Sequence, residues 1–345
     1  MPTIATYTPD IIDNSGIAAV VRRTRPAATS SAESVPRAAI NRADALDLIA
    51  EHAAQALITE LLLTPKPGLV DMRNSGAHHD MNMQTFLVST RAVAEWFPRF
   101  VEIGHESAHI PASAVLPVLR AAGVQCEKAM FDATEGINTH KGAIFSLGLL
   151  CAAASRLLGV GTELNRERIC AEVASMCVGL IDRELNGTQI ARTAGERMFK
   201  LYGLSGARGE AASGFEIVRT VALPLYDHLR SESVCEDLAL LQVLLQLLAV
   251  NNDTNLVARG GLAGLQYVHH HARKLLREGG VLVPGGLRKM AAFDDKLIAC
   301  HLSPGGTADL LAVTWFLAGD LGVPAGADLH SIETGTRRAV RTAEL

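Results

Sequence analysis

Residues 135–142 read Glu-Gly-Ile-Asn-Thr-His-Lys-Gly and run directly into the apolar segment Ala-Ile-Phe-Ser-Leu-Gly-Leu-Leu at residues 143–150. From there, apolar side chains recur at helical spacing and define one broad buried face. They are Ile144, Leu147, Leu150, Cys151, Ala154, Leu157 and Leu158. We expect Asn138 or Thr139 to cap this helix and Gly136 to provide the sharp turn into it. The stretch therefore predicts a buried helix that is entered through a glycine-containing loop.

Lys141 is unusual in the first turn of such a helix. A cation at this position opposes the helix dipole, at a cost of about 0.3–1 kcal/mol. A bound anion would explain it, because free backbone N–H groups and a lysine can hold a phosphate together. The alternative is a solvated lysine at a helix start, and this segment alone does not decide between the two.

The composition favours packed helices in a cytoplasmic protein. The 345 residues are 48% hydrophobic but only 4% aromatic, so the core is rich in Ala, Leu and Val. A net charge of −4 argues against a nucleic-acid surface and against an anionic membrane partner. Six cysteines without a CxxC pair indicate buried free thiols in a reducing compartment. We find no secretory signal, and the longest apolar run, residues 238–250, is too short to span a bilayer.

The pattern predicts an all-α single domain over residues 40–345, preceded by a disordered extension over residues 1–39. The extension is rich in Pro, Ser, Thr and Ala; a docked strand or a partner-binding arm is the alternative. The sequence shows no run of alternating strands and no fixed-period repeat. Residues 236–250 are apolar on nearly every face, which predicts a central helix. The predicted helices cover residues 45–63, 83–97, 114–134, 141–158, 166–186, 193–202, 211–229, 236–250, 261–278, 287–299 and 307–318.

Polar residues concentrate in five glycine-containing loops, at residues 65–81, 136–142, 202–210, 251–261 and 303–311. Glycine-rich loops that lead into helices often bind phosphate oxygens. Their basic residues are Lys66, Arg73, Lys141, Arg208 and Arg259, and their acidic residues include Asp71, Asp80, Glu135, Glu210, Asp253 and Asp309. Acids beside phosphate-binding loops suit a Mg²⁺–nucleotide site. None of the loops is a P-loop or a dinucleotide-binding fingerprint.

Each loop also has a purely structural explanation. Glycine followed by Ser or Thr can simply cap a helix, as Thr307 with Asp309 would do. The same mixture in five loops makes that explanation less favoured. The histidine runs at residues 78–79 and 269–271 do not predict a metal site, because adjacent helical histidines point in different directions and no HExxH or cysteine partner accompanies them. A Ser/His/Asp triad stays open, although no GxSxG elbow supports it.

The loop motifs together resemble the triphosphoribosyl-dephospho-CoA synthase family over residues 45–318. They are TPKPGLVD with NSGAHHDM, GINTHKGAIFSLGLL, YGLSGARGEAASGF, NNDTNLVARGG and SPGGTADLLAVTWFLA. The resemblance implies that ATP and 3′-dephospho-CoA give 2′-(5″-triphosphoribosyl)-3′-dephospho-CoA and adenine. It also implies that the product is the precursor of the prosthetic group on the acyl carrier protein of citrate lyase, or of malonate decarboxylase. The motifs favour citrate lyase, and a downstream transferase and the acyl carrier protein are then indirect partners.

The implied reaction displaces adenine from C1′ of ATP and keeps the triphosphate. It needs an acid for the leaving adenine, a base for the attacking hydroxyl and a carboxylate near an oxocarbenium-like transition state. We expect Asp71, Asp80, Asp253 and Glu210 to fill the catalytic roles, and the first three to bind Mg²⁺. The residues expected to bind ATP phosphates are Lys66, Gly136, Asn138, Thr139, His140, Lys141, Gly142, Arg208, Arg259, Gly305, Gly306 and Thr307.

Two other functional classes stay open. An all-helical hydrolase of the ADP-ribosyl type, with acids around Mg²⁺, would cleave the N-glycosidic bond with water as acceptor. A non-catalytic nucleotide- or CoA-binding partner of the lyase would bind ATP without releasing adenine, and the many acids in the loops argue against it. The sequence does not set the oligomeric state, and a homodimer is compatible with it.

Overall fold

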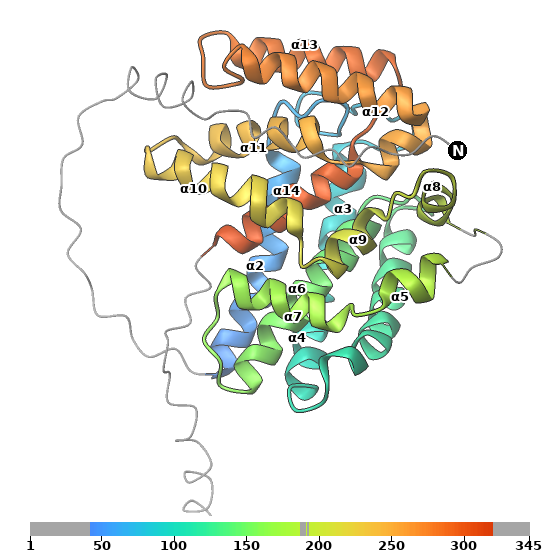
Figure 1. The fold of residues 1–345 in the computed structure, drawn as a ribbon, viewed down its shortest axis with the longest axis vertical. Coiled ribbons are helices and arrows are strands. Elements are labelled where there is room, and N and C mark those ends of the chain that lie inside the picture. The colour runs from blue at the N-terminus through green and yellow to red at the C-terminus, as the bar shows by residue number, and fades with distance from the viewer. Residues whose placement is uncertain (1–41, 187–190, 192, 320–345) are drawn as a thin grey trace, which may run out of the picture.

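In a computed structural model of the chain, residues 42–186, 191 and 193–319 are described. These residues form helices and connecting loops with no strand, which confirms the predicted all-α fold (Figure 1). The predicted extension over residues 1–39 lies outside the described residues. The boundary between an extension and a domain starting at residue 40 therefore stays a prediction.

The helical elements follow one another through short loops. In chain order they are α2 (Arg42–Leu62), α3 (Met83–Ala94), α4 (Phe97–Glu106), the 3-10 helix η1 (Ala112–Ala114), α5 (Leu116–Ala133), α6 (Lys141–Gly159), α7 (Arg166–Met176), the π-helical η2 (Asp182–Asn186), α8 (Ala194–Tyr202), α9 (Gly206–Ala212), the π-helical η3 (Val218–Ala222), α10 (Leu223–Ser231), α11 (Glu236–Val250), α12 (Thr254–Arg277), α13 (Gly286–Ala299) and α14 (Gly305–Ala318).

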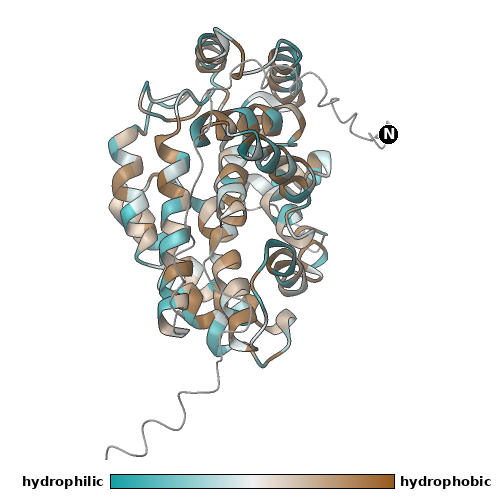
Figure 2. Ribbon diagram, turned by 90° about the vertical axis from the view of Figure 1, so that its left-hand side faces the viewer, coloured by the Kyte–Doolittle hydropathy of each residue, from teal (hydrophilic) through white to brown (hydrophobic). Residues whose placement is uncertain are grey.

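Helices α6, α11 and α14 form the centre of the fold. Helix α6 contacts α2, α4, α5, α7, α9 and α14, while α14 also contacts α10, α11 and α12 (Figure 1). All three are rich in Leu and Ala and are buried on most faces, because neighbouring helices surround them. The burial of α11 confirms the prediction that residues 236–250 are central. The outer helices carry both hydrophobic and hydrophilic residues, as expected of amphipathic helices (Figure 2).

Helix α6 is the longest apolar segment of the fold's centre. Within the described residues it is the helix long and apolar enough to cross a membrane, whereas the sequence pointed to residues 238–250 as the longest apolar run. The fold buries 83% of this apolar window, so the surrounding helices already cover its surface. In this structure α6 is a core helix.

Three of the predicted helices are interrupted in the structure. The segment 83–97 ends at Ala94, and a separate helix α4 follows, because Pro98 stands in its first turn and starts a helix there rather than ending one. The segment 166–186 ends at Met176 and continues as η2. The segment 211–229 is interrupted where Gly214 and Phe215 take positive φ angles, so that α9, η3 and α10 replace one helix.

The fourth predicted loop is also shorter than expected. Helix α12 already begins at Thr254, and the backbone leaves the helical conformation only at Gly261, with φ 62° and ψ −168°. Glycine tolerates this region because it has no Cβ. The chain therefore makes nearly two early helical turns, which carry Arg259, before the long part of α12 begins.

Candidate active site

A cluster of polar side chains is buried where α2 ends and where α6, α12 and α14 begin. Its members come from segments far apart in the sequence, and all but Asp309 are at most 8% exposed. We define this buried polar cluster as Glu60, Lys66, His140, Asp253, Thr307 and Asp309. Buried ionisable groups are costly unless they are paired, hydrogen-bonded or matched by a ligand, so the cluster is the strongest candidate for a functional site.

Lys66 is the buried cation of this cluster, with an exposed fraction of 1%. Its Nζ donates to the backbone oxygen and to Oε1 of Glu60, both at 2.6 Å. An ammonium group has three hydrogens, and no third acceptor is found among the residues that the structure describes. The prediction placed Lys66 at a phosphate site, and the structure leaves one of its donors available to a ligand.

Asp253 joins the N-termini of α12 and α14. Its Oδ1 accepts the N–H groups of Asn255 and Leu256, as an N-cap does, and its Oδ2 accepts the N–H and the hydroxyl of Thr307 at 2.7 and 2.8 Å. A Cβ at Gly306 would lie 3.2 Å from this carboxylate. Burial raises the pKa of Asp253, and these hydrogen bonds oppose the rise. Both oxygens are thus occupied, and the structure assigns Asp253 a role in holding two helix starts together.

Asp309, in the first turns of α14, packs against the start of α6. A Cβ at Gly142 would lie 1.9 Å from Oδ2 of Asp309, so this approach requires glycine. Burial raises the pKa of Asp309 well above its ordinary value, and the negative charges of Glu60 and Asp253 raise it further. The N–H of Ala143 opposes these effects without outweighing them. Asp309 therefore keeps its proton to a higher pH than an ordinary aspartic acid does.

His140 stands at the cap position of α6, where Asn138 or Thr139 was predicted. Its side chain does not cap the helix, and Oδ1 of Asn138 accepts the N–H of Lys141 instead, at 3.3 Å. Nδ1 of His140 lies 2.7 Å from Oγ of Ser89 on α3. Burial and the nearby Lys66 ammonium lower the pKa of His140 to about 3, so the imidazole is neutral.

The electrostatics of the cluster favour a bound anion. Three helices, α6, α12 and α14, begin here, and the N-terminus of each contributes a partial positive charge. The Lys66 ammonium adds a positive charge, which the Glu60 carboxyl group beside it partly balances. The carboxyl groups of the cluster oppose this positive charge. A site with groups of both signs can receive an anion together with a proton or a cation.

Several predicted phosphate ligands lie outside the buried polar cluster. The Lys141 side chain is exposed and pairs with Glu127 on α5 at 2.7 Å, which is the solvated alternative left open above. Arg208 pairs with Glu184 in η2 at 2.8 Å. Gly136 and Asn138 are exposed in the loop before α6. A Cβ at Gly305 would face the amide nitrogen of Asn255 at 2.9 Å, so Gly305 adjoins the cap of α12.

Asp71 folds the loop that carries Lys66. Its Oδ2 accepts the N–H of Lys66 at 2.8 Å, and its Oδ1 accepts the N–H groups of Arg73 and Asn74. The side chain is buried, with both oxygens occupied. This is the local turn pattern that aspartate commonly forms with the backbone that follows it. The structure thus shows Asp71 shaping the lysine loop.

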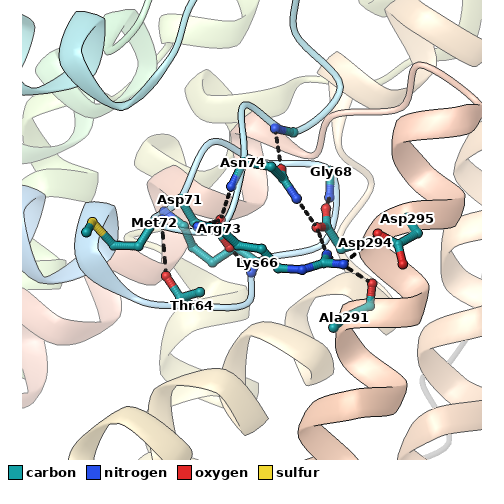
Figure 3. A network of polar contacts seen from close by, with 11 residues as sticks. Thr64, Lys66, Gly68, Asp71, Met72, Arg73, Asn74, Ala291, Asp294 and Asp295 are labelled. Atoms are coloured by element: carbon teal, nitrogen blue, oxygen red, sulfur yellow. Dashed lines mark hydrogen bonds and ion pairs between the residues drawn. The ribbon is translucent and has the colours of Figure 1, made fainter.

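Asp294 on α13 anchors the same loop from a distance (Figure 3). Its fully buried carboxylate accepts the N–H of Gly68 at 2.8 Å, the guanidinium of Arg73 at 2.6 Å and the amide of Asn74 at 2.8 Å. Nη2 of Arg73 also donates a hydrogen bond to Oδ1 of Asp295, at 2.7 Å. We call this contact set the Asp294 anchor. It fixes the Lys66 loop to the C-terminal part of the fold.

Ser303, His78 and Asp80 form a line that resembles a catalytic triad. Nε2 of His78 lies 2.9 Å from Oγ of Ser303, and Nδ1 lies 3.6 Å from Asp80. Arg259 Nη2, however, is 3.2 Å from the same Nδ1, and arginine can only donate. Nδ1 of the neutral ring therefore accepts, and Nε2–H donates to Ser303. A triad needs the opposite polarity, so this arrangement does not support one.

Glu210 lies in α9 and belongs to another environment. Burial raises its pKa to about 7, and Oε2 accepts the N–H of Ile217 at 3.3 Å. Its charged neighbours are Glu216 and Arg219. Such a pKa suits an acid or base at neutral pH. The contacts of Glu210 nevertheless connect it to the segment before η3, and none of them reaches the buried polar cluster.

The predicted metal ligands Asp71, Asp80 and Asp253 do not come together. The carboxyl oxygens of Asp71 and Asp253 accept hydrogen bonds from backbone and hydroxyl donors, and the side chain of Asp80 is 65% exposed beside His78. Within the described part of the chain, no group of three or more His, Cys, Asp or Glu residues is arranged to hold a metal ion.

Sequence reasoning missed several residues of the site. Glu60 sits inside a predicted helix, where an acid normally faces solvent. Ser89 and Asp294 lie on helices that no glycine-rich motif marks. Asp309 was noted among the loop acids but was not selected, and its signal was its position in the first turns of a helix that follows Pro-Gly-Gly.

Comparisons with known proteins identify the family of this chain. A family model described as ATP:dephospho-CoA triphosphoribosyl transferase matches residues 46–324. The 2-(5''-triphosphoribosyl)-3'-dephosphocoenzyme-A synthase of Escherichia fergusonii is 54% identical over 272 residues, which cover 78% of this chain and 90% of that protein. The synthase of Klebsiella pneumoniae is 54% identical over 274 residues, 79% of this chain and 90% of that protein. No solved structure gave a significant match. The chain therefore belongs to the ATP:dephospho-CoA triphosphoribosyl transferase family.

Proposed function

We propose that the buried polar cluster is where this chain carries out the reaction of its family. The triphosphoribosyl group of ATP is transferred to the ribose 2′-hydroxyl of 3′-dephospho-CoA, and adenine is released. The observation that carries this proposal is the meeting of three helix N-termini and the buried Lys66 around carboxyl groups. A site of this kind can hold a polyphosphate intact while chemistry takes place at C1′.

The cationic side of the cluster binds the triphosphate. The Lys66 ammonium supplies a donor, the starts of α6 and α14 supply partial positive charge, and His140 lies beside them. Because Glu60 already holds Lys66 in place, little ordering of that side chain is needed when ATP binds. The triphosphate is bound but not cleaved, so these groups position it and take no part in bond breaking.

The acidic side of the cluster serves the glycosidic bond. The C1′–N9 bond of ATP breaks, the C1′–O2′ bond forms, adenine takes up a proton and the 2′-hydroxyl loses one. Asp309, with its raised pKa, is the group suited to protonate the departing adenine. The Glu60 carboxyl group, paired with Lys66, is placed to stabilise positive charge that develops on the ribose ring.

Magnesium would enter as the counter-ion of ATP. This ion usually takes most of its ligands from phosphate oxygens and water, with one or two protein carboxylates. Glu60 is the cluster carboxylate that would bind the ion. Its hydrogen bond to Lys66 uses Oε1 and leaves Oε2 for a metal, whereas both oxygens of Asp253 accept hydrogen bonds. The ion would neutralise part of the triphosphate charge.

The wider role is proposed from the same chemistry. The product would serve as the prosthetic-group precursor of an acyl carrier protein, that of citrate lyase in preference to malonate decarboxylase. All six cysteines are free thiols and four are buried, which supports a reducing, cytoplasmic location. A homodimer is compatible with this function, and the chemistry does not depend on it.

The test is a reaction of the purified chain with ATP, Mg²⁺ and 3′-dephospho-CoA, followed by free adenine and by the mass of the CoA species. We expect adenine only when the acceptor is present, with a product heavier by one triphosphoribosyl unit. Adenine release without the acceptor would indicate the hydrolase alternative. Absence of both products would indicate a binding protein.

The site is tested by removing the buried pair. The double variant Glu60→Gln/Lys66→Met removes both charges together and so avoids leaving one uncompensated charge in the interior. We expect ATP binding to weaken by at least about tenfold. The surface change Lys128→Met, which removes only an exposed pair with Asp132, is the matched control and should leave binding unchanged.

A further inference from the structure

The imidazole of His140 has a buried nitrogen that the protein does not satisfy. Nε2 has no hydrogen-bond partner among the described residues, and the residue is 3% exposed. Nδ1, in contrast, lies 2.7 Å from Oγ of Ser89. Buried polar atoms in native proteins are nearly always hydrogen-bonded, so an unsatisfied ring nitrogen beside a buried lysine indicates a group that arrives with a ligand.

Ser89 connects this ring to a second hydroxyl. Its Oγ lies 2.5 Å from Oγ1 of Thr139, so Thr139, Ser89 and His140 form a hydrogen-bonded chain. Each hydroxyl has one hydrogen, and a neutral imidazole has one. Two arrangements are therefore consistent. Either Ser89 donates to Nδ1, and Nε2 carries the hydrogen, or Nδ1–H donates to Ser89, and Nε2 has a lone pair.

The expected ligand selects between these arrangements. The oxygens of a triphosphate only accept hydrogen bonds, so a contact with Nε2 requires Nε2–H. Ser89 must then donate to Nδ1 and can accept from Thr139. The surroundings fit a phosphate better than a neutral purine ring, because His140 stands at the N-terminus of α6 and close to the Lys66 ammonium.

We propose that Ser89 is a positioning residue that holds His140 as the Nε2–H tautomer, and that this hydrogen binds a phosphate oxygen of ATP. The inference rests on the proposed function and adds to it a second donor beside Lys66, together with the hydrogen-bonded chain that orients it. Thr139 keeps the chain adjustable, because the same two hydroxyls can accommodate either tautomer before the ligand arrives.

The experiment measures the Kd of ATP and of inorganic tripolyphosphate for the full chain by calorimetry, with Mg²⁺ present. His140→Phe should weaken both by about 10- to 100-fold, the usual effect of losing one hydrogen bond to a charged group. His140→Gln keeps an amide donor and should recover part of the loss. Ser89→Ala should weaken both by about 2- to 10-fold.

Two matched controls use buried atoms of the same kind. His228→Gln on α10 and Thr90→Val on α3 each change a residue with an unsatisfied buried atom that has no place in the proposed contact. Both should bind ATP and tripolyphosphate like the wild type. Thermal unfolding of every variant separates loss of binding from loss of folding.

Nuclear magnetic resonance of ¹⁵N-labelled histidine gives an independent readout. With tripolyphosphate bound, we expect the His140 Nδ1 to be unprotonated and Nε2 to be protonated. The opposite tautomer would overturn the proposal. A His140→Phe variant that binds tripolyphosphate normally would also overturn the proposal. If that variant loses affinity for ATP alone, the contact of His140 is with the adenosine part of ATP. Ser89→Ala with unchanged affinity would remove Ser89 from the positioning role.

The outcome is separable from that of the proposed function. If the wild type forms the triphosphoribosyl product while His140→Phe keeps its tripolyphosphate affinity, only this inference fails. If the wild type releases no adenine in the presence of 3′-dephospho-CoA, the proposed function fails, whatever the binding data show.

Discussion

Asp309 shows how surroundings can reverse the expected behaviour of one residue. A carboxyl group near a helix N-terminus normally ionises readily, because the helix dipole favours a negative charge. Burial and the neighbouring Glu60 and Asp253 raise its pKa well above the usual value in this structure. An acid that keeps its proton is what a departing adenine needs, whereas a solvated aspartate would already have lost it.

Replacement of Asp309 tests this role. For Asp309→Asn we expect kcat to fall by at least about 100-fold with little change in the KM for ATP, because the amide binds similarly but cannot act as an acid. In the wild type, kcat should decline as the pH rises through the raised pKa of Asp309. Steady-state kinetics against pH measure both effects. A variant with normal kcat would exclude Asp309 as the acid.

His140 makes a prediction about stability. Its pKa is about 3 in the folded chain and about 6.5 when unfolded, so below pH 6.5 the unfolded state binds a proton that the folded state rejects. The free energy of unfolding should therefore fall as the pH drops from 6.5 towards 3. Between pH 7 and 5 this one residue accounts for about 2 kcal/mol.

Urea unfolding at pH 7 and pH 5 measures this contribution. His140→Gln, which cannot titrate, should lose about 2 kcal/mol less than the wild type over that range. His228→Gln serves as the control for general effects of removing a histidine. An identical acid sensitivity in wild type and His140→Gln would show that His140 is not held neutral.

At the scale of elements, the site depends on how closely three helix starts approach one another. Asp253 caps α12 and accepts donors from the first turn of α14, and Asp309 of α14 lies against Gly142 of α6. Each approach uses a small residue or a shared carboxylate in place of an ordinary side chain. The proposed anion site is therefore a property of the junction between these helices.

Gly142→Ala tests the approach of α14 to α6. A Cβ there would lie 1.9 Å from Oδ2 of Asp309, so the carboxyl group must move, and kcat should fall by about tenfold or more. Gly123→Ala in α5 is the matched control, because nothing lies within 4 Å of its Cβ. The control should gain about 0.5–1 kcal/mol of stability and keep its activity. Equal kinetics for the two variants would contradict the proposed contact.

At the scale of the whole molecule, the Asp294 anchor connects the N-terminal and C-terminal parts of the chain. Asp294 lies 226 residues after Gly68, whose N–H it accepts, yet it determines where the loop of Lys66 runs (Figure 3). Leu302 packs against the same loop at Gly68, where an added Cβ would lie 2.2 Å from the backbone oxygen of Leu302. The site is complete only when α13 packs against the loop that follows α2.

A double-mutant cycle on Arg73 and Asp294 tests this connection. We expect Arg73→Gln and Asp294→Asn to be non-additive by about 0.5–3 kcal/mol in the free energy of unfolding, and each to raise the KM for ATP. The exposed pair Arg99 and Glu102 is the control, with a coupling below about 1 kcal/mol and no effect on KM. Additive effects on Arg73 and Asp294 with an unchanged KM would show that the anchor does not position Lys66.

The sequence alone determined the helical fold, because periodicity is local and each apolar stripe is visible within one segment. It also determined the family, because long loop motifs such as residues 136–150 are recognisable without coordinates. It could not distinguish Lys141 from Lys66, since both are lysines in glycine-containing loops. Tertiary structure buries Lys66 against Glu60 and turns Lys141 outward to Glu127.

The tertiary structure likewise decided which carboxyl oxygens are already hydrogen-bonded within the protein. Asp71 and Asp253 were selected for their motifs, but their oxygens are occupied by backbone and hydroxyl donors of the folded chain. Asp309 and Glu60 became candidates only when three helices met. The physical reason is that burial, hydrogen-bond saturation and the pKa of a carboxyl group depend on neighbours tens to hundreds of residues away, which no local pattern records.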